Sequence, residues 1–321
     1  MHNFKFVDNR FTFYMISGIL ILISFAFLFT KGLNYGIDFK GGNILHLTFL
    51  KATNETEIRN VFQAIDKKNK LYFSVDQVII QNVNNKVKDT EYIIQYPTNI
   101  KDSLEANKIQ ELIMVELNNA LPYDKNTLEV SSIGPTVGEE MKRDGVIAAI
   151  LSCLGILLYL AYRFDLQSSC GVLIAVIHDL IIVLGFISIM GDKIEFDTTI
   201  LAAILTLLGY SVNDSIVIFD RIRENTRISK NGTPHTTIVD NSINQSLSRT
   251  MNTTITTLLA LIALALYGGN SIFGFSVALT FGCLVGTYSS NCIAALCVID
   301  IFKIKGAKGD NTSALVPTSA N

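Results

Sequence analysis

The sequence predicts a polytopic α-helical membrane protein that carries one small α+β domain outside the lipid. Of its 321 residues, 49% are hydrophobic and only 17% are charged, against about 25% charged residues in ordinary soluble domains. Six apolar stretches are long enough to cross the hydrocarbon core, which takes about 17–25 helical residues. The polar stretch 31–143 separates the first from the second. Membrane spans and one extramembrane domain are therefore expected.

The six predicted spans cover residues 12–30, 144–162, 169–190, 198–219, 248–267 and 274–300. The charged segment "GPTVGEEMKRDG" (134–145) is expected to lie along the membrane surface before the second span. The tail is polar and lacks periodicity, which predicts disorder. The expected division is an N-terminus with the first span, an outer domain with its connector, a bundle of five helices and a disordered cytoplasmic tail. These parts cover residues 1–30, 31–143, 144–301 and 302–321.

Orientation follows from the basic residues, because Lys and Arg concentrate in cytoplasmic loops. With the N-terminus in the cytoplasm, Lys193 is the only basic residue in the two short outside loops, 191–197 and 267–274. Ten basic residues then lie on the cytoplasmic side, at Lys5, Arg10, Arg163, Arg221, Arg223, Arg227, Lys230, Lys303, Lys305 and Lys308. We therefore expect both termini in the cytoplasm and the stretch 31–143 outside.

The outer stretch alternates between strand and helix patterns. Strands are predicted at 43–50, 72–83, 91–97 and 126–134, with amphipathic helices at 54–69 and 101–121. The first helix shows its apolar residues at helical spacing, for example Ile58, Phe62 and Ile65. The order β-α-β-β-α-β is typical of a ferredoxin-like unit. It predicts the succession of the elements and leaves the strand pairing open.

Asp214 is the sharpest departure from the apolar pattern, within "GYSVNDSIVIFDR" (209–221) of the fourth span. A carboxylate at the centre of a spanning helix costs at least ~2.5–3.5 kcal/mol. Arg249 opens the fifth span at a comparable depth. A pair would favour the ionised carboxylate, and breaking it would free Asp214 to take a proton. The pattern predicts a switchable proton relay. A purely structural Asp214, and an Arg249 that extends to the lipid headgroups, are the competing interpretations.

Other polar residues in the spans are weaker candidates for lining the same pocket. His178 and Asp179 lie near the middle of the third span. Adjacent helix residues point about 100° apart, so we expect these two to face different partners, with a structural hydrogen bond and a proton-transfer role equally compatible. Ser211 and Asn213 flank Asp214, and Thr253 follows Arg249 by one turn. A carboxylate with these nearby oxygens could also bind Na⁺, which is the alternative to a proton as the coupling ion.

Several enzymatic and binding functions lack their motifs. Asp179 and Asp214 could form an aspartyl-protease pair, but no GxGD motif is present. Neither a GxSxG elbow nor a GxxxxGK[ST] phosphate loop occurs. The cysteines have no histidines at metal-ligand spacing, and no basic cluster interleaved with aromatics indicates nucleic acid. We therefore expect a transport-type protein that is not an enzyme, without a metal or cofactor.

Four segments together resemble the SecF family, the smaller membrane subunits of the bacterial SecDF protein-export complex. The segments occur in the order and topology of that family. They are "GIDFKGG" (36–42), "HD" (178–179), "GYSVNDSIVIFDRIRE" (209–224) and "SLSRTMNTTITTLL" (246–259). In the first of them, glycines allow a tight exit from helix to strand, and Asp38 is suited to bond the turn backbone. Gly36, Asp38, Gly41 and Gly42 are thus expected to form the hinge between membrane and outer domain.

The resemblance implies a six-helix half of a resistance-nodulation-division-type bundle in the bacterial inner membrane, with the outer domain in the periplasm. It implies SecD as the partner in a heterodimer, with the SecYEG channel, the translocating polypeptide and membrane lipid as further contacts. The proton-motive force would assist a late step of translocation. Asp214 matches the family's membrane carboxylate and Arg249 its membrane arginine. An exporter of small molecules or lipids is the alternative function, and an assembly factor without ion flux is a third.

Overall fold

The computed structural model describes residues 4–69, 73–83, 89–98, 103–164, 166–191, 193–229 and 233–306. Within them, six helical segments are long and apolar enough to cross a membrane, as predicted. Five are single helices, α1 (Arg10–Thr30), α5 (Pro135–Arg163), α6 (Leu166–Ile189), α7 (Thr198–Ile228) and α8 (His235–Tyr267). The sixth joins α9 (Asn270–Ser289), the π-helical turn η2 (Ser290–Ala294) and α10 (Ala295–Gly306).

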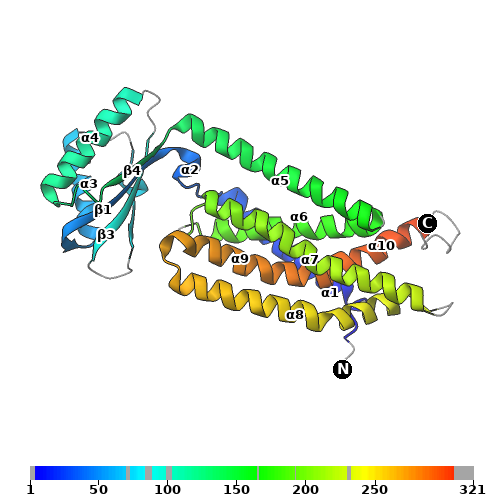
Figure 1. Ribbon diagram of the computed structural model, residues 1–321. Coiled ribbons are helices and arrows are strands. Elements are labelled where there is room, and N and C mark those ends of the chain that lie inside the picture. Colours follow the sequence, from blue (N-terminus) through cyan, green and yellow to red (C-terminus); the bar gives the residue numbers. More distant parts are fainter. Residues whose placement is uncertain are drawn as a thin grey trace.

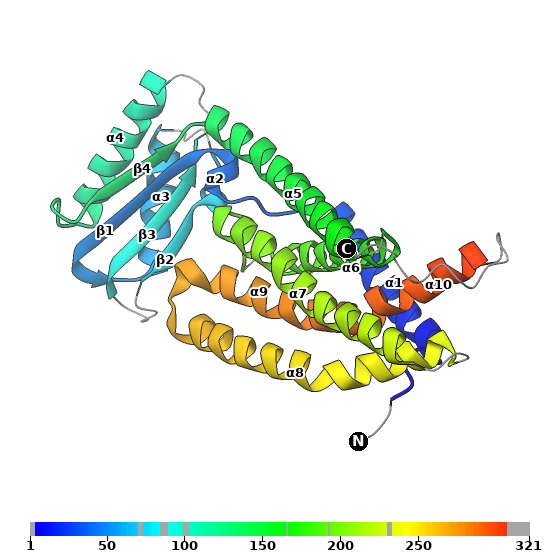
Figure 2. The same ribbon diagram turned by 45° about the vertical axis from the view of Figure 1, so that its right-hand side comes forward.

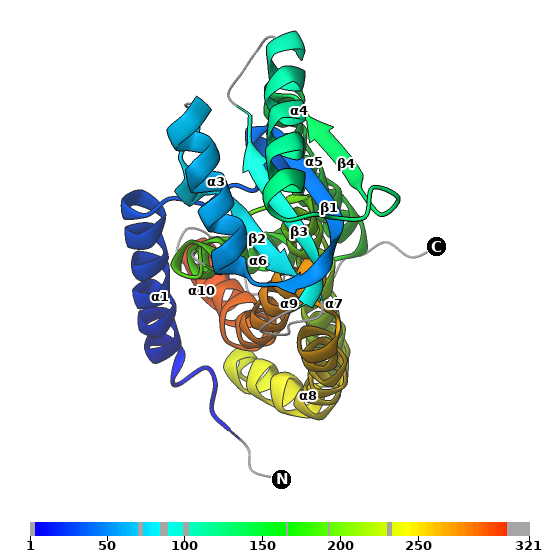
Figure 3. The same ribbon diagram turned by 90° about the vertical axis from the view of Figure 1, so that its left-hand side faces the viewer.

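The helices form an elongated bundle with the β-sheet at one end and the N-terminal helix start and α10 towards the other (Figure 1). The sixth span is the most buried and packs against α6, α7 and α8. By contrast, α1, α5 and α8 direct large apolar side chains outward, such as Phe29, Leu158 and Leu266. Figure 3 shows α1 and α8 at the periphery of the bundle. Outward apolar faces on peripheral helices are what a lipid surrounding requires.

Four boundaries differ from the sequence prediction. Helices α7 and α8 extend beyond the predicted spans, to Ile228 and back to His235 respectively. The connector 134–143 is not a separate surface segment, because α5 runs unbroken from Pro135 and continues the axis of the second span (Figure 2). Residues 302–306 of the predicted disordered tail belong to α10, and the remainder of that tail lies outside the described residues. Periodicity predicts the apolar core of a helix better than its polar ends.

The sheet domain, residues 42–133, has the predicted succession of elements. Its strands are β1 (Gly42–Thr53), β2 (Ile79–Asn82), β3 (Asp89–Pro97) and β4 (Glu129–Ile133), with helices α3 (Glu55–Asn69) and α4 (Ser103–Ala120). The sheet order is β2-β3-β1-β4, and all neighbours are antiparallel. The predicted strand 72–83 is shorter than expected. Its first part is the 3-10 turn η1 (Val75–Gln77), which the Ser74 side chain caps by accepting from the Asp76 N–H.

The core of the sheet domain lies between one face of the sheet and helices α3 and α4. Alternate residues of β1 and β3 point into it, as a half-buried sheet requires. The fully buried members include Leu45, Leu47, Tyr92, Ile94 and Tyr96 from the strands, and Ile58, Phe62, Ile113 and Leu117 from the helices. This domain therefore has its own core, separate from those of the bundle.

Candidate functional site

Asp214 lies inside the bundle on α7, with 2% of its surface exposed. Its Oδ2 atom has no hydrogen-bond partner among the described residues, and the Oγ of the next residue, Ser215, has none either. Buried polar groups in proteins are nearly always hydrogen-bonded. A buried carboxyl oxygen left open in this way is the kind of group that can accept a proton.

Arg249, on α8, is close enough to Asp214 for the two charges to interact. In the described part of the chain, no hydrogen bond or ion pair joins them. The Arg249 side chain is exposed, as is Asn213, whereas Ser211 is buried. Thr253 donates to the Arg249 carbonyl of its own helix. Of the predicted pocket residues, Ser211 turns into the bundle and Asn213 does not, and the predicted relay residue Arg249 is also exposed.

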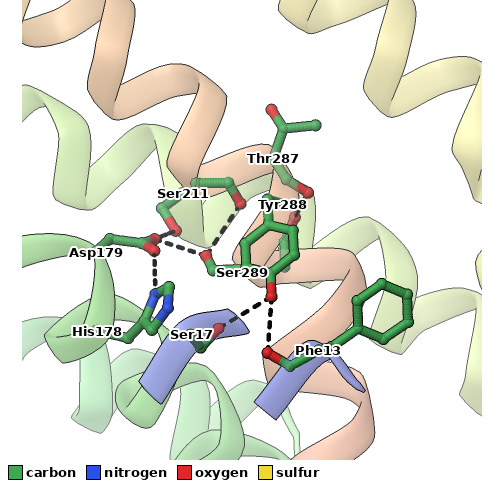
Figure 4. A network of polar contacts seen from close by, with 10 residues as sticks. Phe13, Ser17, His178, Asp179, Ser211, Thr287, Tyr288 and Ser289 are labelled. Atoms are coloured by element: carbon green, nitrogen blue, oxygen red, sulfur yellow. Dashed lines mark hydrogen bonds and ion pairs between the residues drawn. The ribbon is translucent and has the colours of Figure 1, made fainter. Parts of the chain in front are cut away.

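A second polar centre surrounds Asp179 of α6, which is 1% exposed (Figure 4). Its Oδ2 accepts hydrogen bonds from Ser211 Oγ of α7 at 2.6 Å and from Ser289 Oγ of α9 at 2.7 Å. Its Oδ1 lies 2.9 Å from Nδ1 of His178. These three contacts offset the cost of burying the carboxylate. Asp179 thereby links the three innermost helices of the bundle.

Besides its bonds to Ser211 and Ser289, Asp179 contacts the neighbouring His178, a contact that was not expected from the sequence. The two side chains bend towards each other and share the 2.9 Å contact (Figure 4). The 100° between successive residues separates the Cα–Cβ directions, but side-chain rotation closes that gap for an imidazole and a carboxylate. The other ring nitrogen of His178, Nε2, is buried without a partner in the described residues.

The sixth span contributes polar residues that were not singled out from the sequence. The Tyr288 hydroxyl donates to the Phe13 carbonyl of α1 at 2.9 Å and lies 3.0 Å from Ser17 Oγ (Figure 4). On the α8 side, Thr287 Oγ1 lies 2.7 Å from Thr254 Oγ1, which accepts from Tyr210 of α7. The run "TYSSN" (287–291) was the available signal, since five successive polar residues interrupt an apolar span.

The last two residues of this run, Ser290 and Asn291, begin η2, where the helix widens into a π-helical turn. Such turns are rare in proteins, and many of those that occur lie at functional sites. Asn291, in this turn, donates from Nδ2 to the Thr287 carbonyl, while its Oδ1 has no partner among the described residues. The irregular turn therefore lies next to the Asp179 centre.

The glycines of the segment 36–42 allow the close approach of three elements. Gly41 has a φ of 77°, and a Cβ there would lie 2.8 Å from the backbone of Pro135, the first residue of α5. A Cβ on Gly42 would lie 2.2 Å from Ile37 Cγ2 and 2.5 Å from the Tyr96 carbonyl. A side chain at position 41 would therefore collide with the start of α5, and one at position 42 would collide with the short helix α2 (Ile37–Lys40) and with the neighbouring strand β3. Together with α2, these glycines form a compact junction.

The same junction contacts the start of α7. Oδ2 of Asp38 accepts hydrogen bonds from the backbone N–H of Thr198, at 3.0 Å, and from its hydroxyl. The expected bond of Asp38 to its own turn is replaced by this long-range contact. Phe196 pairs with the segment through two backbone bonds, from Gly36 N–H to the Phe196 carbonyl and from Phe196 N–H to the Asn34 carbonyl. The expected hinge is thus bonded to the bundle just before α2, through Asn34 and Gly36, and within α2, through Asp38.

Glu195, beside this junction, is expected to make it pH-sensitive. Burial raises the pKa of Glu195 from 4.5 to about 7; Lys40 opposes the shift, and the carboxylates of Asp197 and Asp38 add to it. The folded state then binds more protons than the unfolded state between these values. Its contribution to stability is therefore full below about pH 4.5 and lost as the pH rises through about 7. Amide exchange at 193–201, corrected for intrinsic rates, should be slower at pH 6 than at pH 8. Glu195→Gln should remove the difference, and an unchanged difference would contradict this assignment.

These features define a membrane protein with buried polar centres between its spans and a sheet domain bonded to one end of the bundle. The sequence matches the family model "Protein export membrane protein SecD/SecF, C-terminal" over residues 113–303, and the "SecD/SecF GG Motif" over residues 26–49. It is 39% identical over 295 residues to the protein translocase subunit SecF of Rickettsia typhi, covering 91% of this chain and 90% of that protein. SecF of Calditerrivibrio nitroreducens is 38% identical, with 91% and 92% covered.

Two solved structures of SecDF share the fold. The crystal structure of SecDF, a translocon-associated membrane protein from Thermus thermophilus, superposes with a TM-score of 0.76 at 33% identity over 94% of this chain. A SecDF structure in a super-membrane-facing form gives a TM-score of 0.67 at 32% identity over 95%. This chain spans 39% of the length of either. The chain therefore belongs to the SecD/SecF family of protein-export membrane proteins. Within that family, it is similar to SecF subunits over about nine tenths of their length.

Proposed function

We propose that this chain is the SecF subunit of a SecDF complex that uses the proton-motive force to assist late steps of Sec-dependent translocation across the bacterial inner membrane. The observation that carries the proposal is the Asp214 carboxyl, which is buried in the bundle with an oxygen that has no partner among the described residues. Proton uptake and release at Asp214, modulated by the nearby charge of Arg249, is the coupling step. A proton that crosses ~100 mV gains about 2.3 kcal/mol, which shifts a two-state equilibrium roughly fiftyfold.

SecD is the partner that completes the site. Helices α7 and α8 expose polar groups within their spans, at Asn213 on α7 and at Arg249, Asn252 and Thr256 on α8. The three residues of α8 share one helix face, because they are spaced by three and four. Polar groups of this kind are costly against lipid, and a protein partner removes that cost. The length of the SecDF chains, of which this chain spans 39%, supports a partner of comparable size.

The sheet domain is a ferredoxin-like periplasmic domain, and both termini are cytoplasmic. Its strand order and antiparallel pairing support the first part, and the distribution of basic residues supports the second. In this orientation the domain faces the side on which the polypeptide emerges from SecYEG. Its single small core favours this function over an exporter, which needs large substrate clefts outside the membrane.

The test is gradient-stimulated export by the complex reconstituted with SecD and SecYEG in proteoliposomes. The wild type should respond to an imposed proton gradient. Arg249→Ala should lose that response, because no positive charge near Asp214 then favours release of its proton. Arg249→Lys should retain part of the response, because it keeps the charge. The matched control is Arg223→Ala, which removes an exposed arginine at the end of α7. A wild type that ignores the gradient, or an Arg249→Ala variant that keeps its response, overturns the proposal.

A further inference from the structure

The sheet domain reaches the helix that carries Asp214 by contact alone. Its covalent links run through the segment 31–41 to α1 and through Gly134 to α5. Helix α7 begins at Thr198, after the connection 190–197 that follows α6. The contact between Asp38 and Thr198 therefore joins the sheet-domain junction to α7, two parts that are not consecutive in the chain.

In this contact, a carboxylate accepts hydrogen bonds at the N-terminus of a helix. The first N–H groups of a helix lack intrahelical partners, and its positive end favours a carboxylate. Asp197 accepts from the Ile200 N–H as the N-cap of α7, and Asp38 accepts from the N–H and the hydroxyl of Thr198. One of the two carboxylates comes from the helix's own chain segment, and the other comes from the junction.

Aromatic packing makes the contact stiff. The rings of Tyr35, Phe39 and Phe196 form a triangle with centroid distances of 5.5–6.0 Å, and the ammonium of Lys142 on α5 lies 5.1 Å from the Tyr35 ring. Phe39 also backs onto Gly138 of α5, where a Cβ would lie 2.8 Å from the Phe39 carbonyl oxygen. The residues that precede α7 are thus packed against the junction, and the junction is packed against α5.

Helix α7 is uninterrupted from Thr198 to Ile228. Asp214 lies sixteen residues after Thr198, which is about 24 Å along the axis at 1.5 Å per residue. Thr198 and Asp214 are thus joined by one uninterrupted helix, with no loop between them.

We propose that Asp38 is a positioning residue that joins the sheet domain to the end of α7, so that a change at Asp214 moves the sheet domain. This inference rests on the proposed function and deepens it. It assigns to the segment 36–42 a transmitting contact, which is more specific than the flexible hinge expected from its glycines.

The experiment compares Asp38→Asn and Thr198→Val in the reconstituted complex with SecD and SecYEG, with Asp76→Asn, an exposed carboxylate of the sheet domain, as the matched control. Three quantities are measured: proton conductance, gradient-stimulated export, and amide exchange at 34–41, 193–201 and the central strand residues 44–48. Both variants should keep the conductance, lose most of the stimulated export and exchange faster at 34–41 and 193–201, with 44–48 unchanged. Each variant weakens the same contact, because Asp38→Asn removes the charge of the acceptor and Thr198→Val removes the hydroxyl donor while the backbone N–H remains. The effects of the two substitutions should therefore be less than additive in the double variant.

The outcomes separate this inference from the proposed function. If the wild type shows no gradient response, the proposed function fails. Amide exchange at 34–41 and 193–201 in the two variants then still decides whether Asp38 and Thr198 hold the sheet domain to α7. If exchange at 193–201 is unchanged in both variants, the joint is overturned. If conductance falls together with export in an assembled complex, Asp38 acts on the ion step and the transmitting role is overturned. Should Asp38→Asn not assemble, Thr198→Val decides, because it keeps the backbone N–H and the shape of the side chain.

Discussion

Replacing Asp214 by asparagine is expected to abolish both proton conductance and gradient-stimulated export while leaving the protein at least as stable as the wild type. Asparagine keeps the shape of the side chain and removes the titrating proton. The carboxyl has an oxygen without a partner among the described residues, so no hydrogen bond to Oδ2 is lost. Burial of a charge in a spanning helix costs at least ~2.5–3.5 kcal/mol, and the variant is relieved of it. Activity and thermal stability should therefore move in opposite directions.

The measurements are proton flux and export in proteoliposomes, together with thermal unfolding of the purified complex. The matched control is Asp144→Asn, which changes an exposed carboxylate of α5 next to Arg143 and should alter neither. A variant that is destabilised but retains the conductance would identify Asp214 as a structural residue, and the coupling step would then have to lie elsewhere.

Replacing Asp179 by asparagine is expected to destabilise the protein, with a loss of about 1.5–3 kcal/mol in the free energy of unfolding. A hydrogen bond to a charged group typically contributes about this much. The carboxylate accepts from Ser211 and Ser289 and contacts His178, so an amide would leave at least one of these donors without an acceptor. Because Asp179 joins α6, α7 and α9, the loss should appear as a lower unfolding temperature of the whole bundle.

Ser211→Ala provides the graded control for this prediction. It removes one neutral donor to the same carboxylate, and single hydrogen bonds between membrane helices average about 0.6 kcal/mol. The ranking of unfolding temperatures should be wild type, Ser211→Ala, then Asp179→Asn. An Asp179→Asn variant as stable as the wild type but without proton conductance would instead place Asp179 in the ion path beside Asp214.

Much of the architecture was predictable because each part depends on local composition. Six spans follow from the length of apolar runs, and the succession of strands and helices in the sheet domain follows from periodicity. The choice of Asp214 as a candidate site residue had a related reason. A carboxylate in an apolar run is costly wherever the helix packs, so it needs an explanation. Helix ends were not predictable, as α5, α7 and α8 show, because a polar helix end has no apolar pattern and continues until its backbone bonds stop.

The sequence by itself determined which residues had to be explained: Asp214, Arg249, His178 and Asp179 stand out in apolar runs, and the segment 36–42 stands out by its glycines. The tertiary structure decided their partners. It joined Asp179 to Ser289 over 110 positions and Asp38 to Thr198 over 160. It also gave Oδ2 of Asp214 no partner among the described residues and turned Arg249 outward. The physical reason is that burial cost belongs to a single residue, whereas a hydrogen bond needs two atoms within about 3 Å. Only the packing of the helices brings such atoms together.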